Sequence, residues 1–225
     1  MESMLQKNTL QFLSSLKNNN NKIWFDANRG WYDETKADFI NLNEAIIKKL
    51  KKKDTTLEPL IAKNCIFRIN RDVRFSPNKT PYKTNMGASI NKGGKKIANA
   101  GYYLHIEPGA SFLAGGIWMP KTIELKKIRQ EIDYNFLEFN KIVASQKIIQ
   151  QFGGIDKSKE YVLTRPPKGY DIDNPAIEYL KFKSYIVSKN ILDEELLKEN
   201  CIQNIVSNFE TITPLIYFIN KAIED

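Results

Sequence analysis

The chain has 225 residues, of which 42% are hydrophobic, and it carries a formal net charge of +8. That length and apolar content suffice for a sizeable core, so we expect a single globular domain over residues 1–225. No apolar run approaches the roughly eighteen residues that cross a bilayer, and the polar stretch Met1–Asn8 is unlike a signal peptide, so we expect a cytoplasmic protein with no membrane partner.

The N-terminal part of the chain shows helical periodicity. Thr9–Asn18 has leucines at helical spacing and is followed by the asparagine run Asn18–Asn21, which predicts a short helix that ends there. Arg29–Lys53 is predicted as a longer helix, because apolar residues recur on one face and lysines gather at its end, where the macrodipole favours them. We interpret this lysine run as a solvated helix end, with a nucleic-acid contact as the weaker alternative.

The apolar pattern changes to period two after residue 64, which predicts strands separated by Gly, Pro and Asn. The four predicted strands are Cys65–Asn70, Lys83–Ile90, Gly101–Glu107 and Ser111–Trp118. We expect the last three to form an antiparallel meander with turns at 91–94 and 108–109. A loop, Arg71–Tyr82, should connect the first two strands.

The pattern beyond Pro120 is mostly helical. Helices are predicted from Pro120 to Gly153, and the prolines and glycine of Arg165–Tyr170 predict a rigid loop. A short helix, a further strand and two closing helices are predicted at Pro175–Leu180, Ser184–Ser188, Glu194–Phe209 and Pro214–Ile223. The predicted fold class is therefore α+β, with an antiparallel sheet of about four to five strands packed with helices from both the N-terminal and the C-terminal parts.

The net positive charge is confined to one stretch. Between Lys63 and Lys96 there are nine positive residues and one negative residue, Asp72, so this stretch alone has a net charge of +8 and the remainder of the chain is neutral. A concentrated charge produces a local potential that attracts anions. The loop cations within this stretch, whose arginine forks suit phosphate or carboxylate oxygens, are Arg71, Arg74, Lys79 and Lys83.

Strand alternation gathers polar side chains on one face of the predicted sheet. In Gly101–Glu107 the apolar residues point to the core, so Tyr103, His105 and Glu107 point the other way. The same rule places Cys65, Phe67 and Ile69 in the core. The other members of the polar face are Arg68, Asn70, Lys83, Asn85, Gly87 and Ser89. Bare backbone at Gly87 and Gly115 would let a ligand approach closely, whereas the alternative is an ordinary solvated face without a ligand.

His105 and Glu107 are the candidate catalytic residues. Because they are two residues apart on one strand, we expect their imidazole and carboxylate about 7 Å apart, flanking a shared ligand. The alternatives are a structural histidine and a Glu107 paired with an arginine. The candidate ligand-binding residues are Arg68, Asn70, Arg71, Arg74, Lys79, Lys83, Asn85 and Tyr103.

The residues support neither a metal site nor a cofactor. His105 is the only histidine, and a mixed site with Glu107 and Asp72 has no recognised spacing. Cys65 and Cys201 lie far apart in the sequence, which argues against a disulfide framework or a cysteine-based zinc site, and we expect both to be buried apolar residues. No Walker loop, dinucleotide fingerprint, G-x-S-x-G or H-E-x-x-H motif occurs, so we expect no cofactor.

Several motifs together resemble one known family. They are RINRDVRFS at 68–76, Lys79, PYK at 81–83, GYYLHIEPG at 101–109, and Gly115-Gly116 with Trp118 and Pro120. On these residues the chain is similar to the conserved hypothetical proteins of bacteria and fungi called domain-of-unknown-function family 2461. Weaker motifs at 24–29 and 167–170 extend the resemblance over nearly the whole chain. The resemblance implies a single compact α+β domain and no established reaction.

Three functions are consistent with these residues, in the following order. The first is an enzyme or binder of a small anionic, phosphorylated molecule on the basic polar face, with His105 and Glu107 handling protons or orientation. The second is nucleic-acid binding, in which the central cations follow a phosphate backbone and aromatic side chains stack on bases. The third is a protein-interaction module whose basic loop docks an acidic partner. The residues specify a site and a ligand class rather than a named reaction or an oligomeric state.

Overall fold

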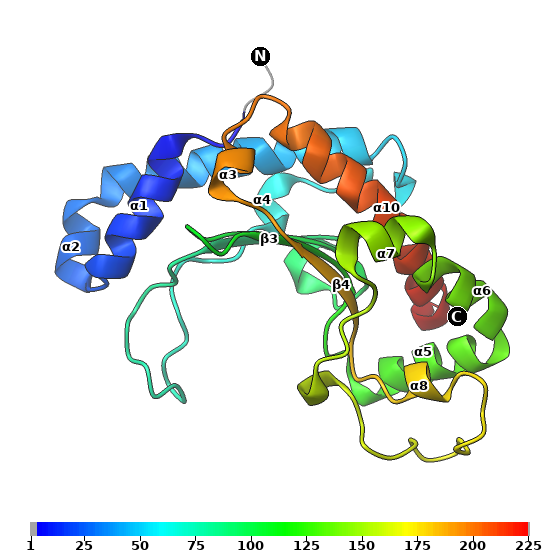
Figure 1. Ribbon diagram of the computed structural model, residues 1–225. Coiled ribbons are helices and arrows are strands. Elements are labelled where there is room, and N and C mark those ends of the chain that lie inside the picture. The colour runs from blue at the N-terminus through cyan, green and yellow to red at the C-terminus, as the bar shows by residue number, and fades with distance from the viewer. Residues whose placement is uncertain (1–3, 225) are drawn as a thin grey trace.

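One antiparallel sheet forms the centre of the molecule (Figure 1). The computed structural model describes residues 4–224, so Met1–Ser3 of the polar N-terminal stretch and Asp225 lie outside it. The strands follow the order β1 (Met86–Ile90), β2 (Gly101–Ile106), β3 (Phe112–Ile117) and β4 (Tyr185–Asn190). All neighbouring strands are antiparallel. The predicted meander and the predicted α+β class are therefore confirmed.

Helices precede and follow the strands of the meander in the sequence. Those before β1 are α1 (Lys7–Asn18), α2 (Lys22–Ala27), α3 (Arg29–Leu50) and α4 (Ala62–Cys65). Those after β3 are α5 (Thr122–Tyr134), α6 (Phe136–Val143), α7 (Gln146–Phe152), α8 (Ile177–Leu180), α9 (Asp193–Leu196) and α10 (Cys201–Glu224). Short 3-10 turns form η1 (Thr55–Leu57), η2 (Gly94–Lys96) and η3 (Lys159–Tyr161).

Most predicted helices have a counterpart, and Arg165–Tyr170 is irregular as predicted. Helix α2 was not predicted, because six residues are too few to show a helical period directly after an asparagine run. Its start is nevertheless encoded locally. The Asn21 side chain accepts a hydrogen bond of 3.0 Å from the backbone N–H of Trp24, which satisfies one of the free donors at the helix N-terminus.

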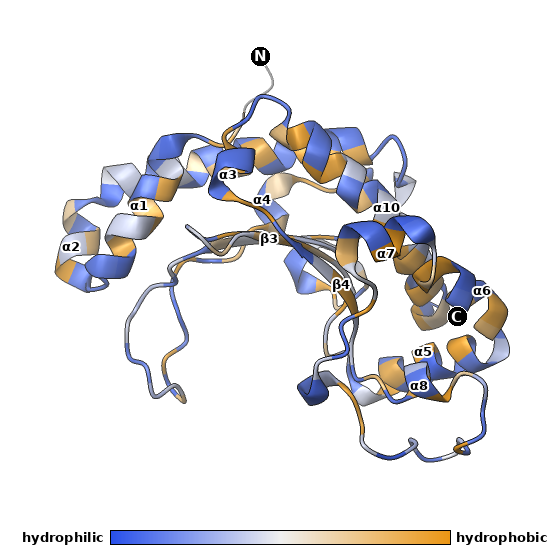
Figure 2. Cartoon of the chain, in the orientation of Figure 1, coloured by the Kyte–Doolittle hydropathy of each residue, from blue (hydrophilic) through white to orange (hydrophobic). Residues whose placement is uncertain are grey.

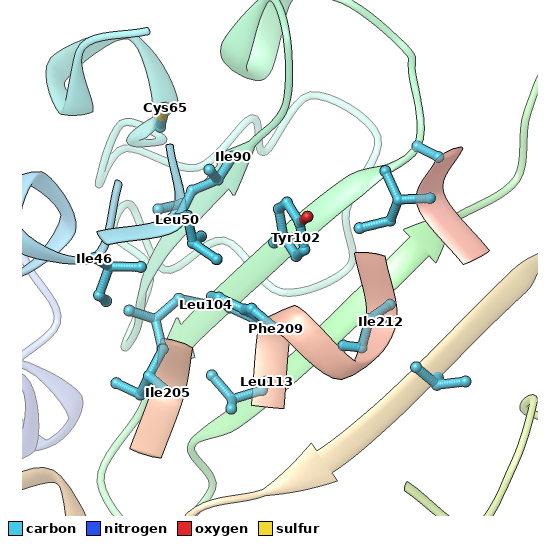
Figure 3. Packing of buried hydrophobic residues seen from close by; sticks show 14 of the residues in the cluster. Ile46, Leu50, Cys65, Ile90, Tyr102, Leu104, Leu113, Ile205, Phe209 and Ile212 are labelled. Carbon is cyan, nitrogen blue, oxygen red and sulfur yellow. The ribbon is translucent and has the colours of Figure 1, made fainter. Parts of the chain in front are cut away.

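Helices α3 and α10 cover one side of the sheet (Figure 1). Figure 3 shows Phe209 and Ile212 of α10 beside Tyr102, Leu104 and Leu113 of the strands. All five side chains are fully buried. Each large apolar side chain removed from water contributes roughly 1.5–3 kcal/mol, so this layer supplies much of the driving force for folding.

Helices α1 and α3 have hydrophobic and hydrophilic residues alternating along them, as amphipathic helices do (Figure 2). Their buried faces meet in an aromatic cluster, in which the Phe25 ring lies 6.5 Å from Phe12 and 5.0 Å from Tyr32. Tyr82, which precedes β1, stacks on Phe25 at a centroid distance of 4.0 Å. This contact fixes α2 and α3 against the chain segment at the β1 edge of the sheet.

The predicted strand Cys65–Asn70 is wrong. Cys65 ends α4, and the following residues make only isolated bridges, from Ile66 to Ala88 and from Asn70 to Tyr82. Cys65 and Ile69 are buried as predicted, but Ile66 is also buried and Phe67 is 38% exposed, so this segment does not follow the period of two that the sequence pattern suggested. Phe67 is therefore not a core residue.

Helix α10 is one continuous helix, whereas two helices separated before Pro214 were predicted. Proline removes one backbone hydrogen bond and normally breaks or kinks a helix. Here Ile212 and Thr213 before the proline and Leu215 and Ile216 after it are all buried. Burial of apolar side chains on both sides of Pro214 outweighs the loss of one hydrogen bond.

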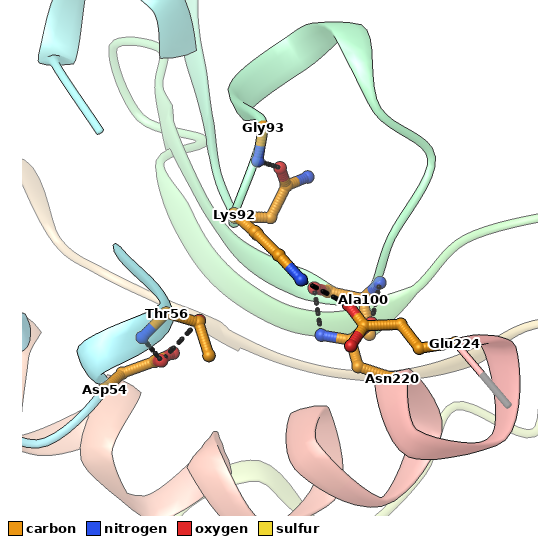
Figure 4. A network of polar contacts seen from close by, with 8 residues as sticks. Asp54, Thr56, Lys92, Gly93, Ala100, Asn220 and Glu224 are labelled. Carbon is orange, nitrogen blue, oxygen red and sulfur yellow. Dashed lines mark hydrogen bonds and ion pairs between the residues drawn. The ribbon is translucent and has the colours of Figure 1, made fainter. Parts of the chain in front are cut away.

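Polar contacts attach the end of α10 to the connection between β1 and β2 (Figure 4). The Asn220 side chain donates to the Ala100 carbonyl at 3.1 Å and accepts from the Ala100 N–H at 2.9 Å. Lys92 lies 3.2 Å from the Glu224 carboxylate. The Asn91 side chain accepts from Gly93 N–H at 3.0 Å. These contacts determine where the adjacent turn η2 lies.

Both cysteines are unpaired and buried, as predicted. Among residues 4–224, each helix is either too short or too polar to cross a bilayer.

Candidate functional site

The side of the sheet opposite α3 and α10 is not covered by these helices (Figure 1). The side chains of Ser89, Tyr103, His105 and Glu107 are half-exposed. In Figure 1 this open face is flanked by the loop 71–82 and by the segment around α8. Strand pairing places Gly87 opposite His105 and Ser89 opposite Tyr103, so these four predicted members of the polar face do share one surface. Gly115 belongs to the other side, where a Cβ would lie 2.6 Å from Ile212 of α10.

A hydrogen-bonded chain of four side chains crosses the open face. The Tyr103 hydroxyl lies 3.2 Å from His105 Nδ1, and His105 Nε2 lies 3.2 Å from a Glu107 carboxylate oxygen. The other Glu107 oxygen accepts from the Thr84 hydroxyl at 2.9 Å. The two candidate catalytic residues are thus in direct contact, rather than flanking a ligand at about 7 Å as expected from strand spacing. Glu107 is paired with His105 and not with an arginine.

Aromatic rings enclose this chain of side chains. The His105 imidazole stacks on Phe112 at 4.5 Å with an interplanar angle of 17°. The Tyr103 phenol lies across Gly87, where a Cβ would be only 2.5 Å from the phenol oxygen. Gly87 is therefore required for the Tyr103 ring and is not bare backbone open to a ligand. Burial raises the pKa of Tyr103, which favours a protonated phenol that donates to His105.

The cations of the loop 71–82 are occupied within the loop itself. Arg71 donates to the Thr80 hydroxyl and, at 3.3 Å, to the Ser76 hydroxyl. Lys79 donates to the Val73 carbonyl at 3.0 Å. A further loop cation, Arg74, forms an ion pair with Asp72 at 2.6 Å. The structure therefore brings these three predicted ligand-binding cations together as an internally bonded loop and not around His105.

Lys83 and Asn85 lie between this loop and β1. The Lys83 ammonium is 5.5 Å from the centre of the Phe67 ring, whose edge faces Tyr103 at 6.4 Å. Burial and, to a lesser extent, the positive charge of Arg68 lower the pKa of Lys83. Asn85 is half-exposed, and its side chain makes no hydrogen bond with residues 4–224.

A separate pocket of about 400 Å³ lies between helices α2 and α3 and the segment 66–70, at the β1 edge. Its lining contains five cations from different parts of the chain, namely Arg29 and Lys36 of α3, Lys63 of α4, Arg68, and Lys95 of η2. Asn70 also lines this pocket. Of the predicted site residues, only Arg68 and Asn70 belong to the lining. His105, Glu107 and Tyr103 do not.

The charges that line the pocket are poorly compensated. Asp26 is its only acidic lining residue, and this carboxylate is bound to Lys22 at 2.5 Å. The side chains of Lys36, Lys63 and Arg68 make no hydrogen bond or ion pair with any residue of the described range 4–224. Arg29 forms an ion pair with Asp33 at 3.4 Å, and Lys95 donates a hydrogen bond to the Ile66 carbonyl. The other three cations, which have no such partner, produce a positive potential that a bound anion would neutralise.

A family model described as Conserved hypothetical protein (DUF2461) matches residues 8–218. The chain belongs to this family. No curated protein and no solved structure matches it. The range matched by the DUF2461 model includes the whole pocket lining and the open face. Among residues 4–224 of this DUF2461 member, no group of three or more His, Cys, Asp or Glu side chains is close enough to hold a metal ion.

Four pocket cations of this DUF2461 chain, Arg29, Lys36, Lys63 and Lys95, were not among the predicted ligand-binding residues. Lys63 and Lys95 lie within the stretch that carries the net charge, whereas Arg29 and Lys36 lie outside it, in α3. A signal was present, because Arg29, Tyr32, Lys36 and Ile40 recur at helical spacing and therefore share one helix face. This face, which mixes cations with apolar residues, is the face of α3 that lines the pocket.

Proposed function

We propose that this protein binds a small anionic ligand, of the class that carries a phosphate group, in the pocket between α3 and the segment 66–70. The observation that carries the proposal is the gathering of five cations and one acid around about 400 Å³. Arginine forks and lysine ammonium groups are the side chains that hold phosphate oxygens in proteins. The cations come from segments far apart in sequence, so their convergence is a property of the fold.

The cations of the loop 71–82 are already bonded to other residues of that loop, which favours a small ligand over nucleic acid. Nucleic-acid binding requires exposed cations that follow a phosphate backbone. Arg71, Arg74 and Lys79 of the basic loop already bind Thr80, Asp72 and the Val73 carbonyl. Lys36, Lys63 and Arg68, which have no such partners, instead lie around one pocket whose volume suits a molecule with few phosphate groups.

His105 and Glu107 lie outside the pocket lining, so the proposed function is binding and includes no reaction. In this proposal the His105–Glu107 pair orients the phenol of Tyr103 rather than contacting the ligand. A carboxylate on one nitrogen of a neutral imidazole favours the tautomer in which the other nitrogen accepts a hydrogen bond from the phenol.

Calorimetric and thermal titrations with inorganic phosphate and pyrophosphate at constant ionic strength test the proposal. Ligand at a hundredfold excess over Kd should raise the free energy of unfolding by about 2.7 kcal/mol. Arg68→Ala and Lys36→Ala should each weaken binding about tenfold, because each removes one charge-assisted contact. The charge-matched controls are Arg165→Ala and Lys147→Ala, which alter exposed residues outside the pocket lining.

Equal losses in the pocket variants and the control variants would show a nonspecific charge effect and contradict the proposal. So would the absence of any stabilisation of the wild type by either compound. Affinity that grows with the length of a single-stranded oligonucleotide, falls steeply with salt and is not displaced by pyrophosphate would favour nucleic-acid binding instead.

A further inference from the structure

The buried part of the pocket lining is uncharged. Six lining residues are buried, and they are Phe25, Tyr32, Ile66, Ile69, Tyr82 and Met86. Ile40 of α3 is half-buried beside them. None of these side chains carries a charge, and most have no polar atom. The inner wall of the pocket is therefore apolar and aromatic.

The charged part of the lining is exposed. Arg29, Lys63, Arg68 and Lys95 are all exposed to solvent, and Lys36 is half-exposed. Arg29 joins the two parts, because its guanidinium lies 5.9 Å from the Phe25 ring and 5.4 Å from the Tyr32 ring. Charged groups at the mouth and apolar groups inside are the reverse of a pocket built to enclose a bare inorganic anion.

Burial of a bare anion deep in this pocket would be unfavourable. An anion removed from water needs hydrogen-bond donors or cations around it, and the buried lining offers no cation. An apolar group in the same position would instead remove its own surface from water and pack against apolar side chains. The two parts of the lining thus suit the two ends of one amphiphilic molecule.

We propose that the ligand is a phosphate monoester of an apolar alkyl or aryl group, whose apolar group enters the pocket while its phosphate stays at the mouth among Arg29, Lys36 and Arg68. This inference rests on the proposed function and adds the orientation and the chemical class of the ligand. It predicts that the organic group, and not only the phosphate, determines the affinity.

A series of compounds measures that contribution directly. Calorimetric titration at constant ionic strength compares inorganic phosphate with methyl, propyl, butyl and phenyl phosphate. Each methylene that enters the apolar part should tighten binding about fourfold. The affinity should stop increasing once the alkyl group is longer than the pocket. Butanol, which has the butyl group without the phosphate, should bind at least about tenfold more weakly than butyl phosphate, because it loses the contacts to the cations.

One variant separates the contribution of the apolar wall to the binding affinity from the contribution of the cations. Ile40→Gln keeps the side chain close to its original length in a helix while placing an amide beside the apolar wall. This substitution should weaken the binding of butyl phosphate several-fold and leave the affinity for inorganic phosphate unchanged. Ile149→Gln is the matched control, since Ile149 of α7 is 48% exposed and outside the pocket lining. Circular dichroism and thermal unfolding establish that both variants are folded.

The outcomes distinguish this inference from the proposed function. Tightening along the series that is reduced in Ile40→Gln but not in Ile149→Gln supports the inference. If inorganic phosphate binds as tightly as every ester, and Arg68→Ala weakens both, the orientation is wrong while the anion site remains. If neither inorganic phosphate nor the esters bind, both fail. Butanol binding as tightly as butyl phosphate also overturns the inference, because the cations would then contribute nothing.

Discussion

The Tyr103 phenol oxygen lies 3.2 Å from Nδ1 of His105, on the side of the sheet that α3 and α10 leave uncovered. His105 Nε2 faces the Glu107 carboxylate at 3.2 Å. An ionised carboxylate only accepts hydrogen bonds, so Nε2 donates to Glu107, and in a neutral imidazole Nδ1 is then the acceptor for the phenol. The imidazole is thus fully engaged, with Phe112 against its face.

Replacement of His105 tests how tightly this chain of side chains is coupled. His105→Phe preserves the stacking on Phe112 but leaves the Tyr103 hydroxyl and one Glu107 oxygen without partners, which should cost about 1–3 kcal/mol in urea unfolding. Tyr103→Phe removes one hydrogen bond and should cost about 0.5–1.5 kcal/mol. In the double variant the losses should not add, because both changes break the same contact. Additive losses would mean that the two side chains act independently.

Asp54 provides a test on the opposite side of the sheet. Its carboxylate is buried and accepts hydrogen bonds from the Thr56 N–H and hydroxyl at 3.1 and 2.6 Å (Figure 4). It also accepts a hydrogen bond from the Tyr102 hydroxyl at 3.0 Å. Tyr102→Phe removes one donor from a buried carboxylate and should lower the free energy of unfolding by about 1–3 kcal/mol. Tyr134→Phe, at an exposed tyrosine, should change it by less than about 0.5 kcal/mol. Equal effects would indicate that the Asp54 contact contributes little.

Cys65 gives a prediction for alkaline pH. Burial raises the pKa of the Cys65 thiol from 9.0 to about 11. Between these values the unfolded chain releases the thiol proton and the folded chain retains it, so this thiol's contribution to stability is complete below pH 9 and is lost as the pH rises toward 11. The wild type should therefore lose stability relative to Cys65→Ala across this window in urea unfolding. A constant difference between the two proteins would show that the thiol titrates normally.

Two glycines provide a matched comparison of packing. Gly115→Ala would place a Cβ 2.6 Å from buried Ile212, and such overpacking should cost about 1–3 kcal/mol. Gly30→Ala in α3 meets nothing within 4 Å and should leave the stability unchanged or slightly raised, because alanine favours helices. Thermal unfolding of the two variants measures the contrast. Tolerance of alanine at position 115 would mean that α10 can move away from β3.

Replacement of Arg71 distinguishes the cations that stabilise the loop from those that bind the ligand. Arg71→Ala should loosen the loop 71–82, since Arg71 is hydrogen-bonded to Thr80 and Ser76, and limited proteolysis within the loop should become faster. Phosphate binding should persist, because Arg71 does not line the pocket. Loss of phosphate binding with an unchanged proteolysis rate would assign Arg71 to the ligand instead.

The sequence predicted the parts of the fold that have a strong local signal. The leucine spacing of α1, the meander β1 to β3 and the polar face that holds Tyr103 and His105 all follow from periodicity. The failures have a different origin. A proline breaks most helices, but burial on both sides of Pro214 depends on tertiary packing, which no local pattern contains.

Of the residues that the sequence singled out as ligand-binding candidates, Arg68 and Asn70 line the pocket. The clustering of cations along the sequence drew attention to the stretch that contains Arg68. It did not separate Arg68, which lines that pocket, from Arg74, which is paired with Asp72 two residues away. Nor did it include Arg29 and Lys36, because the packing of α3 on the segment 66–70 is what joins them to the other cations.

The distribution of these cations has a mechanical consequence. Arg29 and Lys36 belong to α3, whereas Arg68 and Lys95 belong to the β1 edge, so their mutual repulsion acts to separate the N-terminal helices from the strands. Counterions reduce that repulsion within a Debye length of about 8 Å at physiological ionic strength. The attachment of the helices to the sheet should thus become more stable as salt is added. One multivalent anion bound between these cations would stabilise the contact between the N-terminal helices and the β1 edge.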